Sequence, residues 1–409
     1  DNIKCGNSLI GWDYFERQLI PDQEEVERVN PFDWEKAFPG IFTQGGFDAV
    51  IGNPPWISLS GKFGTDVYSS SQIQYLIKKY DGNTYMPNMY EYFVAQGLLL
   101  INETGYFSFI VPDRLGFNNQ FTDLRKRIVY EVMIRKLLYK APFPGITADT
   151  LIFVYQKSEH PLSQTIDVSE FGKESLLINQ KEIITNRDYI FRYFENKEIQ
   201  SLVNTIDSIC NFRLKEICKT TSGFGGKSKL ITSERVDKNQ ILTMKGESIG
   251  RYKFSHFLYF DFKKKNITGR TTDPYKLGYR PKILIRKTGD QIIATYDTSG
   301  VFPEQSLYFI YDKNSPVSYF FILGILNSSL LDSYFRAKLL TNKKSIAQIK
   351  KVDLDELPMV IVDMNNNNEM NKHNLMVSLV EQMLELHKRT PQTPFECEQL
   401  EREIAATDA

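Results

Sequence analysis

The sequence predicts an α/β protein in which a doubly wound sheet precedes a β-rich section and a closing helical segment. Two observations predict the sheet: strand-like and helical patterns alternate up to about residue 157, and FDAVIGN at 47–53 is apolar enough for a central parallel strand. A third observation sets the next section apart. Between residues 211 and 355, strand signals dominate, and Lys and Arg outnumber Asp and Glu about two to one.

The elements of the first part follow in order from periodicity and turn signals. FDAVIGN forms one strand, YFSFIVP at 106–112 another, and IRKLLY and LIFVYQK the last two. Residues 1–10 are predicted as a short strand leading into a loop, and 11–46 as a helix with connections. The remaining predictions are a mobile loop with a short helix (57–84), a helix (88–102) and a helix from Asn118 or Asn119 to about Val132.

The second part is less regular at its start. Residues 157–215 predict irregular structure with one helix near 195–209. KILIRKTGDQIIATYD predicts a hairpin with its turn at 288–290, and SLYFIYD a further strand. Residues 316–337 predict one apolar helix, 365–368 a polar break, and the chain ends in a helical segment. The predicted domains are 1–157 (core), 158–210 (bridging segment), 211–365 (basic section) and 366–409 (C-terminal helical segment).

Composition restricts the classes of protein to consider. The 409 residues carry no net charge, and the hydrophobic fraction of 42% is normal for a protein with sizeable cores, so we expect two or three domains. No apolar run is long enough to cross a membrane, and no signal peptide opens the chain. The four cysteines and four histidines are scattered, which argues against a disulfide framework or a metal site. We therefore expect a cytoplasmic protein.

Asn53-Pro54-Pro55-Trp56 directly follows the FDAVIG strand. Its chemistry suits a planar amine, whose delocalised lone pair makes it a poor nucleophile. The Asn53 amide oxygen and the Pro54 carbonyl could accept the hydrogens of the amine, while the two prolines fix the backbone. Trp56 offers a flat surface on which a base can stack. The alternative is a proline-rich turn closed by a buried tryptophan. The preceding strand favours the functional interpretation, because ligands bind at the carboxyl ends of strands in α/β folds.

Here the sequence resembles a family. FDAVIGNPPW resembles the catalytic motif of class I methyltransferases that act on planar nitrogens, above all adenine-specific DNA methyltransferases. Asn88-Met89-Tyr90, GYFSFIVPDRLGFNNQF and APFPGITADTLIFVYQK resemble later motifs of the gamma, TaqI-like group. TTSGFGGKSK, YRPKILIRK and ILGILNSSLLDSYF resemble the target-recognition domain of that group, and QLEREIAATDA the tail helix of type IIG restriction-modification enzymes.

The resemblance implies a mechanism. The target adenine is flipped out of the duplex, Asn53 and Pro54 hold its amine, and Trp56 stacks on one face. Phe143 matches the second stacking aromatic of the family, although ordinary packing remains an alternative. The methyl group passes in line from S-adenosylmethionine to the amine, and no metal is needed.

The cofactor motifs match the family only in part. Before FDAVIGN there is neither a glycine-rich turn after a strand nor the acidic residue that follows the second strand. Cys5-Gly6-Asn7-Ser8-Leu9 resembles the next cofactor motif, with Asn7 where the family usually has Asp. We therefore expect a partial Rossmann-like core without its first βα units, in which Asn7, Leu9 and Asn53 are the candidate cofactor contacts. We also expect a larger parent, with a nuclease domain upstream of this chain, and an inactive fragment.

The basic section predicts contacts with double-stranded DNA. The candidates are Lys227, Lys229, Arg280, Lys282, Arg286 and Lys287, of which the arginines suit guanine readout. Solvated surface remains the alternative for each residue taken alone. Lys263–Lys265 are further candidates, and the loop 57–85, with Lys62, Lys78 and Lys79, is predicted to close over the extruded base or to be a plain flexible loop. Two other functions stay open: a protein-glutamine or RNA methyltransferase, and a non-catalytic DNA specificity module.

Overall fold

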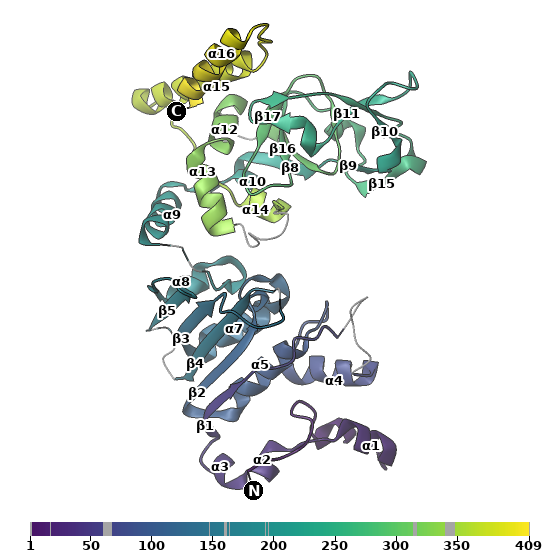
Figure 1. Cartoon of the computed structure of the whole chain (residues 1–409), viewed down its shortest axis with the longest axis vertical. Coiled ribbons are helices and arrows are strands. Elements are labelled where there is room, and N and C mark those ends of the chain that lie inside the picture. The colour runs from purple at the N-terminus through teal and green to yellow at the C-terminus, as the bar shows by residue number, and fades with distance from the viewer. Residues whose placement is uncertain are drawn as a thin grey trace. The chain divides into compact units, whose positions relative to one another are not determined.

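A computed structural model describes residues 2–16, 18–59, 68–146, 148–158, 162, 164–192, 194, 196–313, 317–339 and 348–408. Lys62 and Pro316, which entered the sequence predictions, lie outside these residues. The chain divides into two compact units, Asp1–Phe194 and Glu195–Ala409, which are described separately below (Figure 1).

The first unit is built on a six-stranded mixed sheet of order β1-β2-β4-β3-β5-β6. β1 is parallel to β2 and β3 is parallel to β5, whereas β4 is antiparallel to both β2 and β3, and β6 to β5. The strands are β1 (Phe47–Gly52), β2 (Ile101–Pro112), β3 (Val132–Tyr139), β4 (Thr150–Lys157), β5 (Thr165–Glu170) and β6 (Leu176–Asn179). The helices are α1 (Gln23–Val29), α2 (Trp34–Ala37), α3 (Pro39–Phe42), α4 (Ser70–Tyr80), α5 (Met89–Leu100), α6 (Arg114–Phe117), α7 (Thr122–Glu131) and α8 (Gln180–Thr185). The predicted mixed α/β class is confirmed.

The topology brings loops that are distant in the sequence together at one end of the strands of this sheet. Gly52 at the end of β1 pairs with Phe109 in β2, and Pro112 at the end of β2 pairs with Thr150 at the start of β4. Tyr139, which ends β3, pairs with Leu151. The segments that follow β1, β2 and β3 therefore lie at the same end of the sheet, together with the segment that precedes β4.

One prediction for the start of the chain was wrong. Residues 2–10 form no strand, and only Asn7 makes an isolated bridge, to Pro31, because Leu9 and Ile10 are instead buried in the core. FDAVIG forms a strand, as predicted, but within the described residues it lies at the edge of the sheet rather than at its centre. Ile51 is consequently 86% exposed.

The prediction of irregular structure over 157–215 was wrong for residues 165–185. β5 and β6 extend the first sheet, and α8 follows them. Ile166 and Val168 point into the core, but the strands are short and carry charged residues, which hides the alternation in the sequence. The helix predicted near 195–209 is present as α9 (Lys197–Ile209), in the second unit.

The second unit contains two four-stranded sheets, β17-β16-β19-β8 and β10-β14-β11-β18, and three two-stranded pairs. The predicted hairpin is confirmed as antiparallel β16 and β17, and the predicted strand SLYFIYD as β19. The strands are β7 (Phe212–Arg213), β8 (Cys218–Ser222), β9 (Phe224–Gly226), β10 (Ile231–Thr232), β11 (Ile241–Met244), β12 (Ile249–Gly250), β13 (Lys253–Phe254), β14 (Leu258–Phe260), β15 (Ile267–Arg270), β16 (Lys282–Arg286), β17 (Ala294–Asp297), β18 (Phe302–Pro303), β19 (Leu307–Lys313) and β20 (Pro358–Met359).

The predicted helix 316–337 is split into α12 (Tyr319–Leu326) and α13 (Ser329–Tyr334). Asn327 interrupts it, because its side-chain amide exchanges two hydrogen bonds of 3.0 Å with the backbone of Ala294, and Ser328 then caps α13. The closing segment forms two helices rather than one. The remaining helices of the unit are α10 (Leu214–Ile217), α11 (Pro274–Leu277), α14 (Lys351–Asp355), α15 (Asn367–Leu386) and α16 (Pro394–Asp408).

None of the helices in the described residues is long and apolar enough to span a lipid bilayer. Within the same residues, no cluster of three or more His, Cys, Asp or Glu side chains is arranged to hold a metal ion.

Candidate functional site

Asn53-Pro54-Pro55-Trp56 leaves the carboxyl end of β1, at the edge where the segments after β2 and β3 also emerge. Asn53 is exposed, Pro54 is buried and Trp56 is half-buried. The Trp56 indole N–H donates to the carbonyl of Ile110 in β2 over 3.3 Å. This hydrogen bond ties the tetrapeptide to the neighbouring strand while the Asn53 side chain stays open to a ligand.

Phe143 lies against Trp56, although the two residues are far apart in the sequence. It belongs to the connection between β3 and β4, and its ring centroid is 5.4 Å from that of Trp56, with the planes inclined by 37°. A base inserted between two rings needs about 3.5 Å on each side, or about 7 Å in all. The two rings therefore touch each other here, and they must separate before both can stack on one base.

Two carboxyl groups at the same edge were missed by the sequence analysis. Asp113 directly follows β2 and Asp149 directly precedes β4, and the Asp113 N–H donates to the Asp149 carbonyl over 2.9 Å. Burial, and secondarily the charge of Asp149, raises the pKa of Asp113 to about 6. Their positions next to strand ends were the signal in the sequence, but only the pairing of β2 with β4 brings them together.

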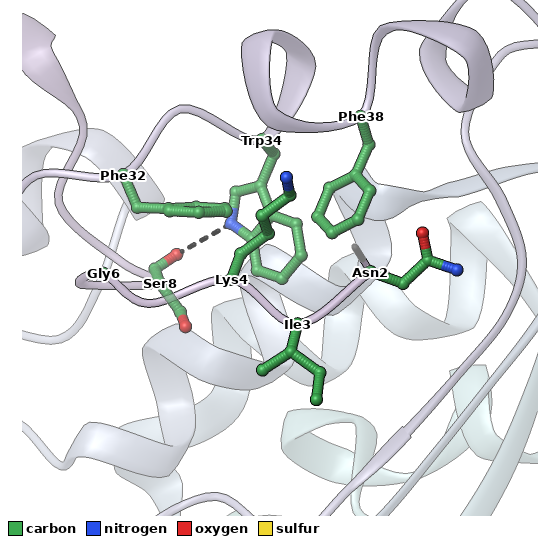
Figure 2. A pocket seen from close by; sticks show the side chains of 8 residues that line it. All are labelled: Asn2, Ile3, Lys4, Gly6, Ser8, Phe32, Trp34 and Phe38. Atoms are coloured by element: carbon green, nitrogen blue, oxygen red, sulfur yellow. Dashed lines mark hydrogen bonds between the residues drawn. The ribbon is translucent and has the colours of Figure 1, made fainter.

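A cavity of about 360 Å³ lies beside the first residues of the chain (Figure 2). The rings of Phe32, Trp34 and Phe38 line it, together with Asn2, Ile3, Lys4, Gly6 and Ser8. Gly6 is required here, because a Cβ atom would lie 2.7 Å from the Phe32 ring. Aromatic walls suit an adenine ring, but the lining residues include neither an acidic side chain for ribose hydroxyls nor a glycine-rich turn. These residues alone therefore do not fit the whole of S-adenosylmethionine.

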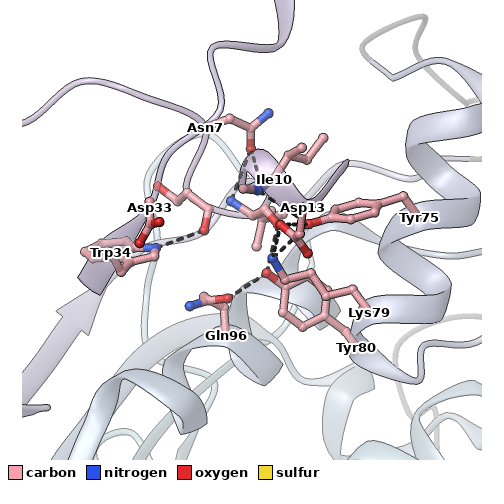
Figure 3. Close-up of polar contacts among 12 residues, drawn as sticks. Asn7, Ile10, Asp13, Asp33, Trp34, Tyr75, Lys79, Tyr80 and Gln96 are labelled. Carbon is pink, nitrogen blue, oxygen red and sulfur yellow. Dashed lines mark hydrogen bonds and ion pairs between the residues drawn. The ribbon is translucent and has the colours of Figure 1, made fainter. Parts of the chain in front are cut away.

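The predicted cofactor contacts Asn7 and Leu9 are both engaged within the protein (Figure 3). The Asn7 amide oxygen accepts hydrogen bonds from the backbone N–H groups of Leu9 and Ile10, at 3.1 and 3.2 Å. The Leu9 side chain is only 1% exposed, and its carbonyl accepts from the Tyr80 hydroxyl at 2.9 Å. The Leu9 side chain belongs to the core, so a cofactor contact at Leu9 would use its backbone, and this contact stays a prediction. Asn7 as a contact stays a prediction.

Polar contacts hold the N-terminal segment on α4 (Figure 3). The Tyr75 hydroxyl donates to Asp13 over 2.7 Å, and the Lys79 ammonium lies 3.3 Å from the same carboxylate oxygen. Burial, followed by the hydrogen bond to Asp13, raises the pKa of Tyr75. Lys79 is therefore tied to Asp13, whereas Lys78 is exposed. Closure of the loop over a base stays a prediction.

The six candidate DNA contacts separate into two groups. Lys227, Lys229 and Arg280 are exposed. The Lys227 N–H donates to the carbonyl of Asn266 over 3.0 Å, which brings Lys227 beside the exposed Lys264 and Lys265. These lysines form a basic cluster at the β9–β15 ribbon.

Lys282 and Arg286 require correction. The side chain of Lys282 is fully buried and forms an ion pair of 2.8 Å with Asp297, which is itself 3% exposed, so it cannot reach a groove. Arg286 donates to the backbone carbonyls of Gly246, over 2.7 Å, and Ile249. Its guanidinium therefore holds the 246–249 loop and is not free for guanine. Lys287 is half-buried and is considered further below.

The glycine-rich stretch after β8 owes its glycines to packing inside the protein. A Cβ atom on Gly223 would lie 2.2 Å from the Glu304 carbonyl oxygen, and one on Gly226 would lie 2.9 Å from the Phe260 ring. All glycines of the stretch are buried. These glycines therefore serve close packing inside the protein, whereas Lys227 and Lys229, which follow them, are exposed.

Two family models match the chain. Residues 2–142 match the Eco57I restriction-modification methylase, and residues 241–359 match the TaqI-like C-terminal specificity domain. A protein of Methanocaldococcus jannaschii, named as a type II restriction enzyme and methyltransferase (RM.MjaORFECS2P), is 27% identical over 83% of this chain and 30% of its own length. The Escherichia coli type II restriction enzyme and methyltransferase RM.Eco57I is 25% identical over 42% of this chain and 16% of its own.

The fold also resembles a solved structure. The type IIL restriction-modification enzyme MmeI, determined in complex with DNA, superposes with a TM-score of 0.54 at 10% identity, covering 92% of this chain and 55% of that one. This likeness concerns the fold alone. This chain spans less than a third of the length of the curated relatives that it matches.

The matched segments thus make residues 2–142 similar to a restriction-modification methylase and residues 241–359 similar to a DNA specificity domain. More particularly, the first segment is similar to the Eco57I methylase family and the second to the TaqI-like specificity domain, which are the resemblances predicted from the sequence. The predicted resemblance is confirmed.

Proposed function

We propose that this chain holds the target base and reads the DNA site in an adenine-specific DNA methyltransferase of a restriction-modification or phage-defence system. The observation that carries the proposal is the contact between Trp56 and Phe143 at the edge of the sheet, next to the exposed Asn53. A second unit with a cluster of exposed lysines and a specificity-domain match supplies the surface for DNA.

The residues at this edge have distinct roles in the proposal. An extruded adenine enters between the Trp56 and Phe143 rings, which separate to admit it. The Asn53 amide oxygen and the Pro54 carbonyl accept the two hydrogens of the exocyclic amine and orient its lone pair. The hydrogen bond from Trp56 to Ile110 fixes the indole as one wall. S-adenosylmethionine supplies the methyl group.

We further propose that polypeptide preceding this chain completes the cofactor site, so that the 409 residues alone are inactive. Two observations support this: β1 has no partner on its outer side among the described residues, leaving Ile51 exposed, and the curated relatives are much longer. The cavity beside Asn7 would then form only part of the cofactor site.

Two alternatives are less well supported. A protein-glutamine or RNA methyltransferase would share the Asn-Pro-Pro-aromatic chemistry, but a specificity-domain match over 241–359 argues for DNA. A non-catalytic DNA specificity module would need no open base site, whereas Asn53 is exposed beside two contacting rings. The nuclease domain expected upstream stays a prediction.

The first test is binding of the chain to a pool of random-sequence duplexes, over a range of salt and with and without S-adenosylmethionine. We expect sequence-dependent binding that weakens with salt and does not respond to the cofactor. Changing Lys227 and Lys229 together to alanine should reduce the salt slope by about 2, because each lost phosphate contact removes about 0.9. Binding no stronger than that of an unrelated neutral protein would refute the proposal, and methyl transfer by the chain alone would refute the proposed incompleteness.

A second prediction tests the base site itself. The chain should prefer a duplex with one mismatched adenine over the fully paired duplex, because an unpaired base costs less to extrude. Trp56→Ala should lower this preference by roughly 5- to 150-fold, the equivalent of about 1–3 kcal/mol of stacking. Competition binding with the two duplexes measures the ratio.

The control for this prediction is Trp12→Ala. Trp12 is 49% exposed and lies outside the candidate site, so its removal should leave the preference unchanged. If both substitutions lower the preference equally, Trp56 affects binding only through the stability of the folded protein. The proposed stacking of Trp56 on the base would then be refuted.

A further inference from the structure

Lys287 occupies an unusual position for a lysine, at the end of β16 and half-buried. Its ammonium donates to the Ser222 hydroxyl over 2.6 Å and lies 4.3 Å from the centroid of the Tyr308 ring. Ser222 and Tyr308 are paired in the β8–β19 ladder, so they lie side by side on the sheet. The sheet thereby fixes the Lys287 side chain instead of leaving it to move freely in solvent.

Arg270 is the second cation at this place. It ends β15 and pairs with Phe224, two residues beyond Ser222. A hydrogen bond of 2.9 Å between the hydroxyls of Thr221 and Thr271 joins the two segments there. Two positive groups from different strands are therefore held near each other by the backbone around them.

The charges around Lys287 are not balanced. Burial first, and the positive charge of Arg270 second, lower the pKa of Lys287 to about 8, against an opposing effect of Glu304. Glu304 is 4% exposed and already accepts from the Ser306 N–H and hydroxyl, at 2.8 and 2.6 Å. No carboxylate of the described residues makes an ion pair with Lys287 or Arg270.

The other titratable groups near Lys287 are Tyr308 and the groups that surround Tyr308. Tyr308, beneath the ammonium, is the group that faces Lys287 from β19, and Lys351, Asp353 and Asp355 of the α14 segment lie near Tyr308. Asp355 already accepts from Thr220 and Lys351. Asp355 and Glu304 are thus engaged elsewhere, and within the described residues no carboxylate forms an ion pair with either cation.

A phosphate group could supply the negative charge that Lys287 and Arg270 lack. It would bring negative charge between two cations and accept from both. The Ser222 hydroxyl, which donates to the Gly223 carbonyl over 3.2 Å, would turn to donate to the phosphate as well. We propose that Lys287, Arg270 and Ser222 form a specific site for one phosphate of the DNA backbone, which sets the register of the second unit on the duplex. This inference rests on the proposed function and adds a defined anion site to it.

The pH dependence of DNA binding distinguishes this site from ordinary surface lysines. Only the charged ammonium attracts phosphate, and Lys287 loses its charge near pH 8, whereas exposed lysines stay charged to about pH 10. Between pH 7 and pH 9 the association constant of the wild-type chain for duplex DNA should therefore fall by up to about tenfold. Affinity is measured at constant ionic strength, on one duplex selected from the random pool.

Two substitutions at the same position separate charge from titration. Lys287→Arg keeps a charge that does not titrate, so the salt slope should persist and the pH dependence should disappear. Lys287→Met should abolish the pH dependence and reduce the salt slope by about 0.9. Lys219→Met is the matched control, because Lys219 is exposed and paired with Asp312, and it should change neither quantity. Thermal unfolding verifies that each variant is folded.

The possible outcomes are distinct. Wild-type binding that depends on salt but not on pH, or an unchanged slope in Lys287→Met, would overturn the phosphate site and leave the proposed function standing. Absence of any DNA binding would remove both. Titration with inorganic phosphate provides a further arm: if it stabilises the wild type but not Lys287→Met, while the substitution leaves DNA affinity unchanged, the site serves a free anion and the inference is wrong.

Discussion

Replacing Lys282 with methionine should destabilise the second unit by about 3–5 kcal/mol, because the change leaves Asp297 as an uncompensated charge in the core. The two groups form an ion pair of 2.8 Å in which the lysine side chain is fully buried. The Lys282 ammonium also donates to the Tyr279 carbonyl over 2.9 Å. Urea unfolding of the whole chain, followed by circular dichroism, measures the loss in the transition of this unit.

Two further variants test whether the loss of stability comes from the unpaired charge of Asp297. Lys219→Met removes an exposed partner of Asp312 and should cost no more than about 1 kcal/mol. Lys282→Met combined with Asp297→Asn should recover most of the stability, because no charge is then left unpaired and the amide oxygen can still accept from Ser299. If Lys282→Met is as mild as Lys219→Met, the buried ion pair with Asp297 does not stabilise this unit and the prediction is wrong.

Replacing Glu91 with glutamine should stabilise the first unit at pH 8 by up to about 3 kcal/mol and have little effect at pH 4.5. Glu91 is 4% exposed, and burial raises the pKa of its carboxyl group from 4.5 to about 7. One carboxyl oxygen accepts from the Asn83 N–H over 3.1 Å, while the other is buried without a partner.

The sign of the pH dependence of stability follows from the linkage between proton binding and folding. A group whose pKa is higher in the folded than in the unfolded protein contributes stability at low pH, and this contribution is lost as the pH rises through the folded value. Stability of the wild type should therefore decline between about pH 4.5 and pH 7, by about 1.4 kcal/mol for each pKa unit of difference. Glutamine keeps the acceptor for Asn83 and carries no charge, so this decline should be absent.

Urea unfolding of the wild type and of Glu91→Gln, each at pH 4.5 and pH 8, gives the free energies of unfolding to be compared. Glu103→Gln is the control, because this side chain is 77% exposed and should not alter the pH profile. A loss of stability in Glu91→Gln at pH 8 would contradict the prediction, since it would mean that the ionised carboxylate contributes favourably to the fold.

The predictable part of the fold rests on strong local patterns. The helix at 88–102, the strand after it and the 282–297 hairpin are present because their apolar residues repeat at one clear period. β5 and β6 were missed because their signals are short, and the helix 316–337 was predicted unbroken because the pairing of Asn327 with Ala294 lies outside any local pattern. Long-range hydrogen bonds of this kind cannot be read from periodicity.

The candidate site shows the same division. The sequence by itself determined the family resemblance, the Asn53–Trp56 tetrapeptide and its place after a strand, because a rigid proline turn and the chemistry of its side chains are local properties. Only the tertiary structure decided that Trp56 and Phe143 touch, that Lys282 is buried and that Lys287 lies against Ser222 and Tyr308. The physical reason is that burial and charge environment arise from strands brought together across long stretches of chain, so identical lysines acquire different roles.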